Sequence, residues 1–178
     1  MDIRNIILGL LESLPMTGYE LKQAFDNSLG YFSGASFGSI YPTLAKLEKE
    51  GLASVKVEPR EGRQRKVYSI TQAGRKEYRD ALGGEMTIPP FRNEFLTRLF
   101  FFSSLKPKRQ EEMAQQYIAY LEEKQASLKS IAPLVEAHAD AYQKMCYRFG
   151  IRLLKQYIET SRKTLKELRE YNEERPIL

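Results

Sequence analysis

The sequence contains very few of the residues from which disulfides, metal centres and many active sites are built. It has one cysteine, Cys146, one histidine, His138, and no tryptophan among 178 residues. A single cysteine excludes a disulfide within the chain, and one histidine beside one cysteine supplies too few ligands for a zinc site. We therefore expect no metal and no cofactor. No nucleophile with a base and no phosphate-cradling glycine loop is present, so we expect no enzyme, with His138 an ordinary helix residue and Cys146 a buried, unreactive thiol.

Long hydrophobic runs are also missing. No segment approaches the roughly 18 apolar residues that a membrane-spanning helix needs. The most apolar N-terminal piece, residues 6–11, follows Arg4 and leads directly into Glu12 without a cleavage-site pattern, which argues against a signal peptide. A cytoplasmic protein is the expectation. The formal net charge of +5 is mildly basic, so the positions of the charges carry more information than their sum.

Two helices are predicted at the N-terminus. The apolar residues of 3–14 recur at helical spacing and stop at Pro15, which predicts a first amphipathic helix. Thr17-Gly18-Tyr19-Glu20 then has the form of a capping box, in which the threonine oxygen accepts from an amide and the glutamate reaches back. A second helix is therefore expected from about 18 to 29, after a very short connection.

A third helix carries a proline near its beginning. Its C-terminus is indicated by Gly51, at a position where a left-handed cap is favoured. Its start is open: if the helix begins near Ser39, Pro42 is a tolerated first-turn residue, whereas a start at Ser36 would require Pro42 to kink it. The face expected in the core is formed by Ile40, Leu44 and Leu47.

After Gly51 the hydrophobic period changes from that of a helix to that of a strand. Residues 53–58 and 66–71 alternate apolar and polar side chains, and the segment 59–65 between them contains a glycine, so we predict a β-hairpin. Residues 60–66 around its tip contain one acidic residue, Glu61, and four basic residues, which are Arg60, Arg63, Arg65 and Lys66. Thr71 then begins a fourth helix that runs to about Leu82.

The C-terminal half is predicted to be helical throughout. Glycine and proline pairs break the chain near residues 83–90, so we expect one domain over 1–83 and a second over 84–178. A short apolar helix before residue 106, a long helix over about 107–131 and a last helix to about 172, with a possible kink at Gly150, follow. Heptad spacing predicts helix pairing in a dimer. The interface residues expected are Ile118, Leu121, Leu128, Ile151, Leu154, Ile158, Leu165 and Leu168.

Three helices followed by a basic hairpin are typical of a winged helix-turn-helix, in which the third helix enters the major groove and the hairpin lies along the backbone. The fold class expected is thus mainly α with a small β-hairpin. Such cores also serve as protein-interaction modules that do not bind DNA, and this alternative stays open. For the DNA-binding hypothesis, the recognition-helix contacts predicted are Ser36, Phe37, Ser39, Tyr41, Pro42, Thr43 and Lys46. The wing and backbone contacts predicted are Tyr19, Lys22, Arg60, Arg63, Gln64, Arg65 and Lys66.

Several motifs in one order resemble the PadR family of bacterial transcriptional regulators. They span residues 3–82, and a looser similarity to longer-tailed members continues at Tyr147-Arg148-Phe149-Gly150-Ile151. The motifs are Leu14-Pro15, Thr17-Gly18-Tyr19-Glu20-Leu21, Ser36 to Leu44, Leu47-Glu48 with Gly51-Leu52, and Arg65 to Thr71 with Gly74. The resemblance implies a homodimer that represses a promoter and is released by a small effector. It places the groove-entering helix on 36–50 and the wing on 60–66.

An effector site is less well indicated. Phe91, Phe95 and Phe100 either line an apolar pocket near the domain junction or belong to the hydrophobic core, which is the more common role of such clusters. The partners expected are double-stranded DNA with a pseudo-palindromic operator, a second copy of the chain, and a small apolar or aromatic effector.

Overall fold

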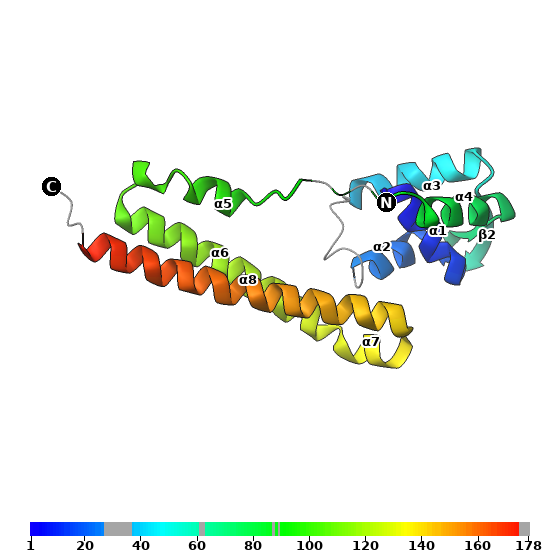
Figure 1. The fold of residues 1–178 in the computed structure, drawn as a ribbon. Helices are drawn as coiled ribbons and strands as arrows, with labels where there is room; N and C mark the ends of the chain where they lie inside the picture. Colours follow the sequence, from blue (N-terminus) through cyan, green and yellow to red (C-terminus); the bar gives the residue numbers. More distant parts are fainter. Residues whose placement is uncertain (27–36, 61–62, 87, 89, 175–178) are drawn as a thin grey trace. The chain divides into compact units, whose positions relative to one another are not determined.

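A computed structural model gives the fold and describes residues 1–26, 37–60, 63–86, 88 and 90–174 (Figure 1). The backbone forms two compact units, Met1–Ile88 and Pro89–Leu178. The observed division thus falls a few residues after the 83/84 boundary expected from the glycine pair. Among the described residues, no helix combines the length and apolar character that a membrane span requires.

The first two helices of the N-terminal unit begin at side-chain caps. Helix α1 covers Ile3–Ser13, and the Asp2 side chain accepts a hydrogen bond from the Asn5 amide. Helix α2 covers Gly18–Asp26. Its capping box is confirmed: the Glu20 amide donates to Thr17 Oγ1 at 3.2 Å, and the Thr17 amide donates to Glu20 Oε2 at 2.7 Å. The predicted continuation to residue 29 lies outside the described residues.

The third helix has its proline in the first turn. A 3-10 turn, η2, covers Phe37–Ser39, and α3 covers Ile40–Lys49, so Pro42 needs no kink. At the other end Gly51 has a positive φ of 73°. The Leu52 amide donates to the Leu47 carbonyl at 2.9 Å and the Gly51 amide to the Glu48 carbonyl at 3.0 Å, which is a Schellman cap.

The hairpin belongs to a three-stranded antiparallel sheet in the order β1-β3-β2. Strand β1 covers Met16–Thr17, β2 covers Ala53–Arg60 and β3 covers Arg63–Ile70. The predicted turn at 59–65 was therefore too long, since Arg60 pairs with Arg63 across residues 61–62. Among the described side chains next to the tip, Pro59 and Gln64 are both exposed, so no buried face imposes alternation on them. Strand β1, with two residues, is too short for a periodic signal.

Helix α4 covers Gln72–Gly83 and closes the N-terminal unit (Figure 1). Thr71 is its N-cap, as predicted: its Oγ1 accepts from the Gly74 amide at 3.1 Å and donates to the Gly51 carbonyl at 2.7 Å. The core of the unit combines side chains from all its helices and strands except α4, whose Tyr78 packs at the edge. Its buried members include Ile7, Leu8, Leu11, Leu21, Ile40, Leu44, Leu47, Tyr68 and Ile70.

The C-terminal unit is a pair of long antiparallel helices with shorter pieces attached. Helix α5 covers Glu94–Leu99, a 3-10 turn η3 covers Phe102–Ser104, and α6 covers Pro107–Ser130. A short helix, α7, covers Ala132–His138, and α8 covers Ala141–Glu174. Figure 1 shows α8 lying along α6. Gly150 is buried inside α8 and does not interrupt it.

The heptad faces pair within one chain, which corrects the reasoning that they need a second chain. Ile118, Leu121, Leu128 and Ile158 are each at most 8% exposed because α6 and α8 cover one another. Across the same seam Arg162 pairs with Glu122 at 2.5 Å and Arg169 with Glu111 at 2.9 Å. Leu165 and Leu168 pack on a small aromatic core, and Ile151 and Leu154 are half-buried. The six other residues thus belong to the intrachain core, whereas Ile151 and Leu154 are only partly covered within the chain.

The phenylalanine cluster divides between core and surface. Phe95 and Phe102 are buried, and the Phe95 ring stacks on Tyr117 with centroids 4.4 Å apart. Phe91 and Phe100 are 69% and 82% exposed, so neither belongs to that core, and a role of the three residues in an effector pocket stays a prediction. Cys146 is exposed on α8, and its predicted burial was wrong.

Candidate nucleic-acid interface

The first turn of α3 projects from the core with its polar side outward. Ile40, Leu44 and Leu47 are at most 2% exposed, which fixes the rotation of the helix about its axis. On the opposite side Tyr41 is 60% exposed, and Pro42 and Lys46 are exposed. Ser39 and Thr43 are half-buried at the same end. This end of the helix is the positive end of its dipole, which favours a phosphate.

Tyr41 also positions α2 against α3. A Cβ built on Gly18, the first residue of α2, would lie 2.5 Å from the Tyr41 ring. Only glycine allows this approach, so the tyrosine lies over the start of α2 while much of its ring stays exposed. The two helices of the helix-turn-helix are thereby held at a short distance beside the reading end of α3.

Arg4 holds the other end of α3. Its guanidinium donates to both carboxylate oxygens of Glu77 on α4, at 2.5 and 3.2 Å, and pairs with Glu50 at the C-cap of α3. The hydrogen bond to Glu77, with the contribution of Glu50, raises the pKa of Arg4 further above its ordinary range despite partial burial. One α1 side chain thus joins α3 to α4. Sequence reasoning missed this cluster because the partners are far apart in the chain.

The hairpin presents cations with different surroundings. Lys66 and Gln64 are exposed on β3, as a phosphate contact requires. Arg65 is half-buried and pairs with Glu58 at 3.2 Å and with Glu20 at 3.9 Å. The side chains of Phe37, Arg60 and Arg63 lie outside the description, and so does Ser36 as a whole; the backbones of Arg60 and Arg63 end β2 and begin β3.

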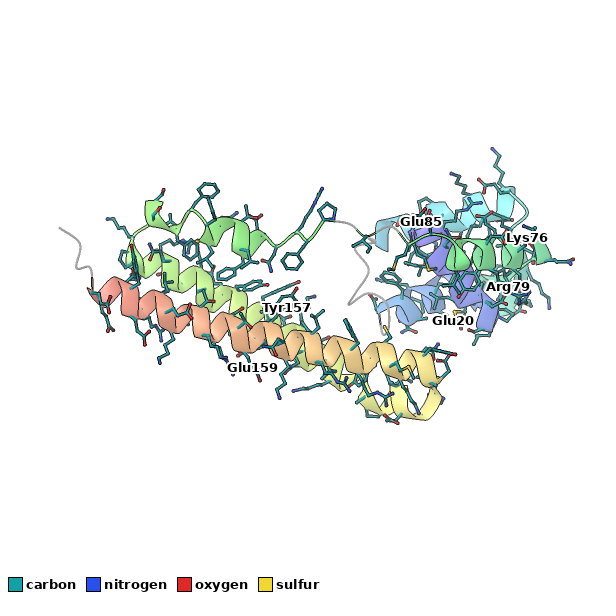
Figure 2. All side chains as sticks on the ribbon, in the orientation of Figure 1. Glu20, Lys76, Arg79, Glu85, Tyr157 and Glu159 are labelled. Carbon is teal, nitrogen blue, oxygen red and sulfur yellow. The ribbon has the colours of Figure 1, made fainter. Side chains whose placement is uncertain are left out.

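Helix α2 adds two exposed side chains near its start. Tyr19 is 62% exposed, and its hydroxyl accepts a hydrogen bond from Gln23 at 3.0 Å. Lys22 is exposed on the same helix, two residues after Glu20, which is labelled in Figure 2. Within the described part of the chain, no group of His, Cys, Asp or Glu side chains is arranged to hold a metal ion. The surface offers hydroxyls, amides and cations, which suits binding to a polyanion.

Comparison with known proteins agrees with this geometry in both units. Residues 7–80 match the Transcriptional regulator PadR-like family, and residues 91–169 match the family described as Virulence activator alpha C-term. The negative transcriptional regulator PadR of Bacillus subtilis is 30% identical over 131 residues, which are 72% of this chain and 70% of that protein.

Solved structures share the fold over nearly the whole chain. The PadR-like transcriptional regulator of Bacillus cereus superposes with a TM-score of 0.83 at 28% identity, covering 94% of this chain and 98% of that one. Bacillus subtilis PadR in complex with operator DNA gives a TM-score of 0.81 at 24% identity, covering 93% and 98%. The recognition helix, wing and long C-terminal helices therefore lie in a known architecture, and this chain belongs to the PadR-like family of transcriptional regulators.

Proposed function

We propose that this regulator acts in the cytoplasm as a homodimeric repressor that binds a pseudo-palindromic operator. In this proposal the protein catalyses no reaction. The N-terminal unit binds DNA and the C-terminal unit dimerises. The observation that carries the proposal is the first turn of α3: its apolar side is buried in the core, and its Tyr41, Pro42 and Lys46 side is exposed. In a winged helix this turn contacts base edges while the hairpin follows the flanking phosphates.

The residues divide by what they can contact. Ser39, Tyr41 and Thr43 stand where short or planar side chains reach base edges, so they set sequence preference. Lys46, Lys66, Arg60 and Arg63 supply charge to phosphates, which contributes affinity for any duplex. Bacillus subtilis PadR, which shares this fold, has been solved with operator DNA, which supports operator binding as the function of the fold.

Dimerisation requires an apolar surface that one chain leaves uncovered. Such a stripe runs along the first half of α8, where its side chains recur at spacings of three and four on one helix face. Its members are Tyr142, Met145, Phe149 and Leu153, which are 81%, 57%, 67% and 41% exposed. A second exposed group surrounds α5 and contains Phe91, Leu96, Phe100 and Phe101. Exposed apolar surface of this extent marks an interface, and we place the dimer contact on these residues.

Release by a small aromatic effector completes the proposal. Bacillus subtilis PadR has also been solved with p-coumaric acid. An effector acts by binding the DNA-competent and incompetent arrangements of the dimer with different affinity. The measurement is operator affinity at increasing concentrations of small aromatic acids, and an affinity that no such compound changes would contradict this part of the proposal.

The DNA-binding proposal is tested by selection from a randomised duplex library, followed by titration of the enriched duplex and a random duplex of equal length across a salt series. We expect an inverted repeat with half-sites about one helical turn apart, one dimer per site, and tighter binding to the enriched duplex. Failure to enrich any motif, with equal weak binding to both duplexes, would favour a protein-interaction module.

The dimer contact is tested by sedimentation of Phe149→Glu, with Leu128→Ala as the comparison. Phe149 is exposed and Leu128 is 1% exposed in one chain. A charge on the proposed contact should give a folded monomer, whereas truncation of the intrachain core should lower stability first. A Phe149→Glu chain that stays fully dimeric would show that the α8 stripe is not the contact.

A further inference from the structure

Arg65 stands out among the hairpin cations because carboxylates already surround it. It lies directly opposite Glu58 in the β2–β3 register, so both side chains are on one face of the ribbon. Its Nη2 and Nε lie 3.2 and 3.4 Å from Glu58 Oε2. The next residue, Lys66, points to the opposite face and is exposed. Neighbouring cations of one strand therefore have different surroundings.

A second carboxylate connects Arg65 to the helix-turn-helix. Glu20 Oε1 lies 3.9 Å from Arg65 Nη1. The other oxygen, Oε2, accepts from the amide and the hydroxyl of Thr17 at 2.7 and 2.9 Å. The capping glutamate of α2 thus divides its two oxygens between its own helix and the wing. Arg65 in turn bridges α2 and the cross-strand residue Glu58.

The ion pair between Arg65 and Glu20 extends the connection between the hairpin and the segment before α2, which the backbone makes through β1 at only two positions. Strand β1 pairs with β3 at Met16–Tyr68 and Thr17–Val67. Beyond Val67, toward the hairpin tip, the chain that paired with β3 has turned into α2. Arg65 lies two residues past the last β1 contact, where β3 pairs with β2 alone, and its side chain adds an ion pair between the hairpin and α2.

The local charges balance at this point. Lys56 Nζ lies 3.5 Å from Glu58 Oε1, so Glu58 stands between two cations. The two positive charges of Lys56 and Arg65 are thus matched by the two negative charges of Glu58 and Glu20. A phosphate approaching Arg65 would have to displace a carboxylate that is already in contact, whereas a phosphate approaching Lys66 meets an exposed ammonium.

We propose that Arg65 is a positioning residue that sets the angle of the wing relative to α2 and α3, and that it is not a phosphate contact. The inference rests on the proposed DNA-binding function and changes the role that the sequence suggested for this arginine. Its chemical basis is the planar guanidinium, which can contact carboxylates on two of its edges at once.

The experiment measures operator affinity against salt concentration for the wild type and six variants of the full-length chain. Lys66→Ala should reduce the slope of log affinity against log salt by about 0.9 per chain, since a phosphate contact is lost. Arg65→Ala should weaken operator binding roughly tenfold, because each of the two chains of the dimer loses half-exposed ion pairs of modest strength. The slope of log affinity against log salt should stay unchanged.

Removal of the partners separates positioning from contact. With Glu58→Gln as background, Arg65→Ala should have a smaller effect than in the wild type, because its main partner is already neutral. Glu20→Gln keeps the helix cap, since glutamine also serves at that position, but removes the charge that faces Arg65. It should weaken operator binding by less than Arg65→Ala, at an unchanged slope. Lys76→Ala, which breaks an exposed ion pair with Asp80 on α4, is the matched control for loss of one charge.

The outcomes exclude one another. If Arg65→Ala lowers the slope as much as Lys66→Ala does, and costs more affinity once Glu58 is neutral, Arg65 contacts phosphate and the inference is wrong. If the wild type prefers no duplex, the proposed function has failed instead. Thermal unfolding of each variant shows whether a loss of affinity reflects a loss of fold.

Discussion

Gly74→Ala offers a sharp test of the packing, because helix propensity and tertiary structure predict opposite signs. Gly74 lies in the first turn of α4, where alanine in place of glycine would stabilise an isolated helix by about 1 kcal/mol. In the folded chain, however, a Cβ at this position would lie 2.1 Å from the Leu52 carbonyl oxygen and 2.9 Å from Ile70 Cγ1. An ordinary carbon–oxygen contact needs about 3.3 Å, so α4 must move away from Leu52 by about 1 Å.

That movement breaks the hydrogen bonds that begin α4. The Thr71 amide donates to the Leu52 carbonyl at 3.0 Å, and Thr71 Oγ1 caps the Gly74 amide at 3.1 Å. Loss of the cap costs about 1 kcal/mol and loss of the backbone hydrogen bond about 1 kcal/mol. Overpacking adds at least about 1 kcal/mol. After the gain in propensity is subtracted, we expect a net loss of about 2 kcal/mol.

The assay is thermal unfolding of the full chain by calorimetry. For a unit of this size, about 2 kcal/mol lowers the transition of the N-terminal unit by roughly 8 to 16 °C. Gly83→Ala is the matched control at the other end of α4, since a Cβ there meets nothing within 4 Å. It should be neutral or slightly stabilising. A Gly74→Ala chain that unfolds at or above the wild-type temperature would refute the reasoning.

Three further predictions test the two cores. Leu44→Ala removes a side chain that is fully buried under the reading end of α3, and should cost about 2–5 kcal/mol in denaturant unfolding and lower operator affinity with it. Burial raises the pKa of Tyr68, so the folded state keeps the phenol proton to a higher pH than the unfolded state does. The free energy of unfolding therefore keeps its full contribution from Tyr68 below the ordinary tyrosine pKa and falls as the pH rises above it. Tyr68→Phe should flatten this alkaline fall. In the C-terminal unit, Gln110 donates to the Phe102 and Leu105 carbonyls at 2.7 and 2.9 Å, so Gln110→Ala should lower the free energy of unfolding by about 2 kcal/mol, whereas Gln116→Ala on the exposed side of α6 should change it little.

Local patterns were sufficient wherever one short stretch holds all the partners of an interaction. The capping box of Thr17 and Glu20, the Thr71 cap and the positive φ at Gly51 each depend on residues within a few positions, and each was predictable from the sequence. The burial of Ile40, Leu44 and Leu47 followed from their helical spacing. The order of these elements, with the basic hairpin after them, was enough to indicate a winged helix.

Distant contacts decided what the patterns left open. Heptad spacing showed that α6 and α8 each carry an apolar face, but spacing does not name the partner, and the fold pairs these faces within one chain. The stripe of Tyr142, Phe149 and Leu153 is exposed, and we propose it instead as the contact with a second copy.

The same limit holds for charge. The sequence determined that arginines gather in the hairpin, because charge is a property of each residue alone. Only the tertiary structure placed Arg65 beside Glu58 and Glu20 and joined Arg4 to Glu50 and Glu77. What a cation can bind depends on which carboxylates already surround it, and the folded chain brings those carboxylates from other elements.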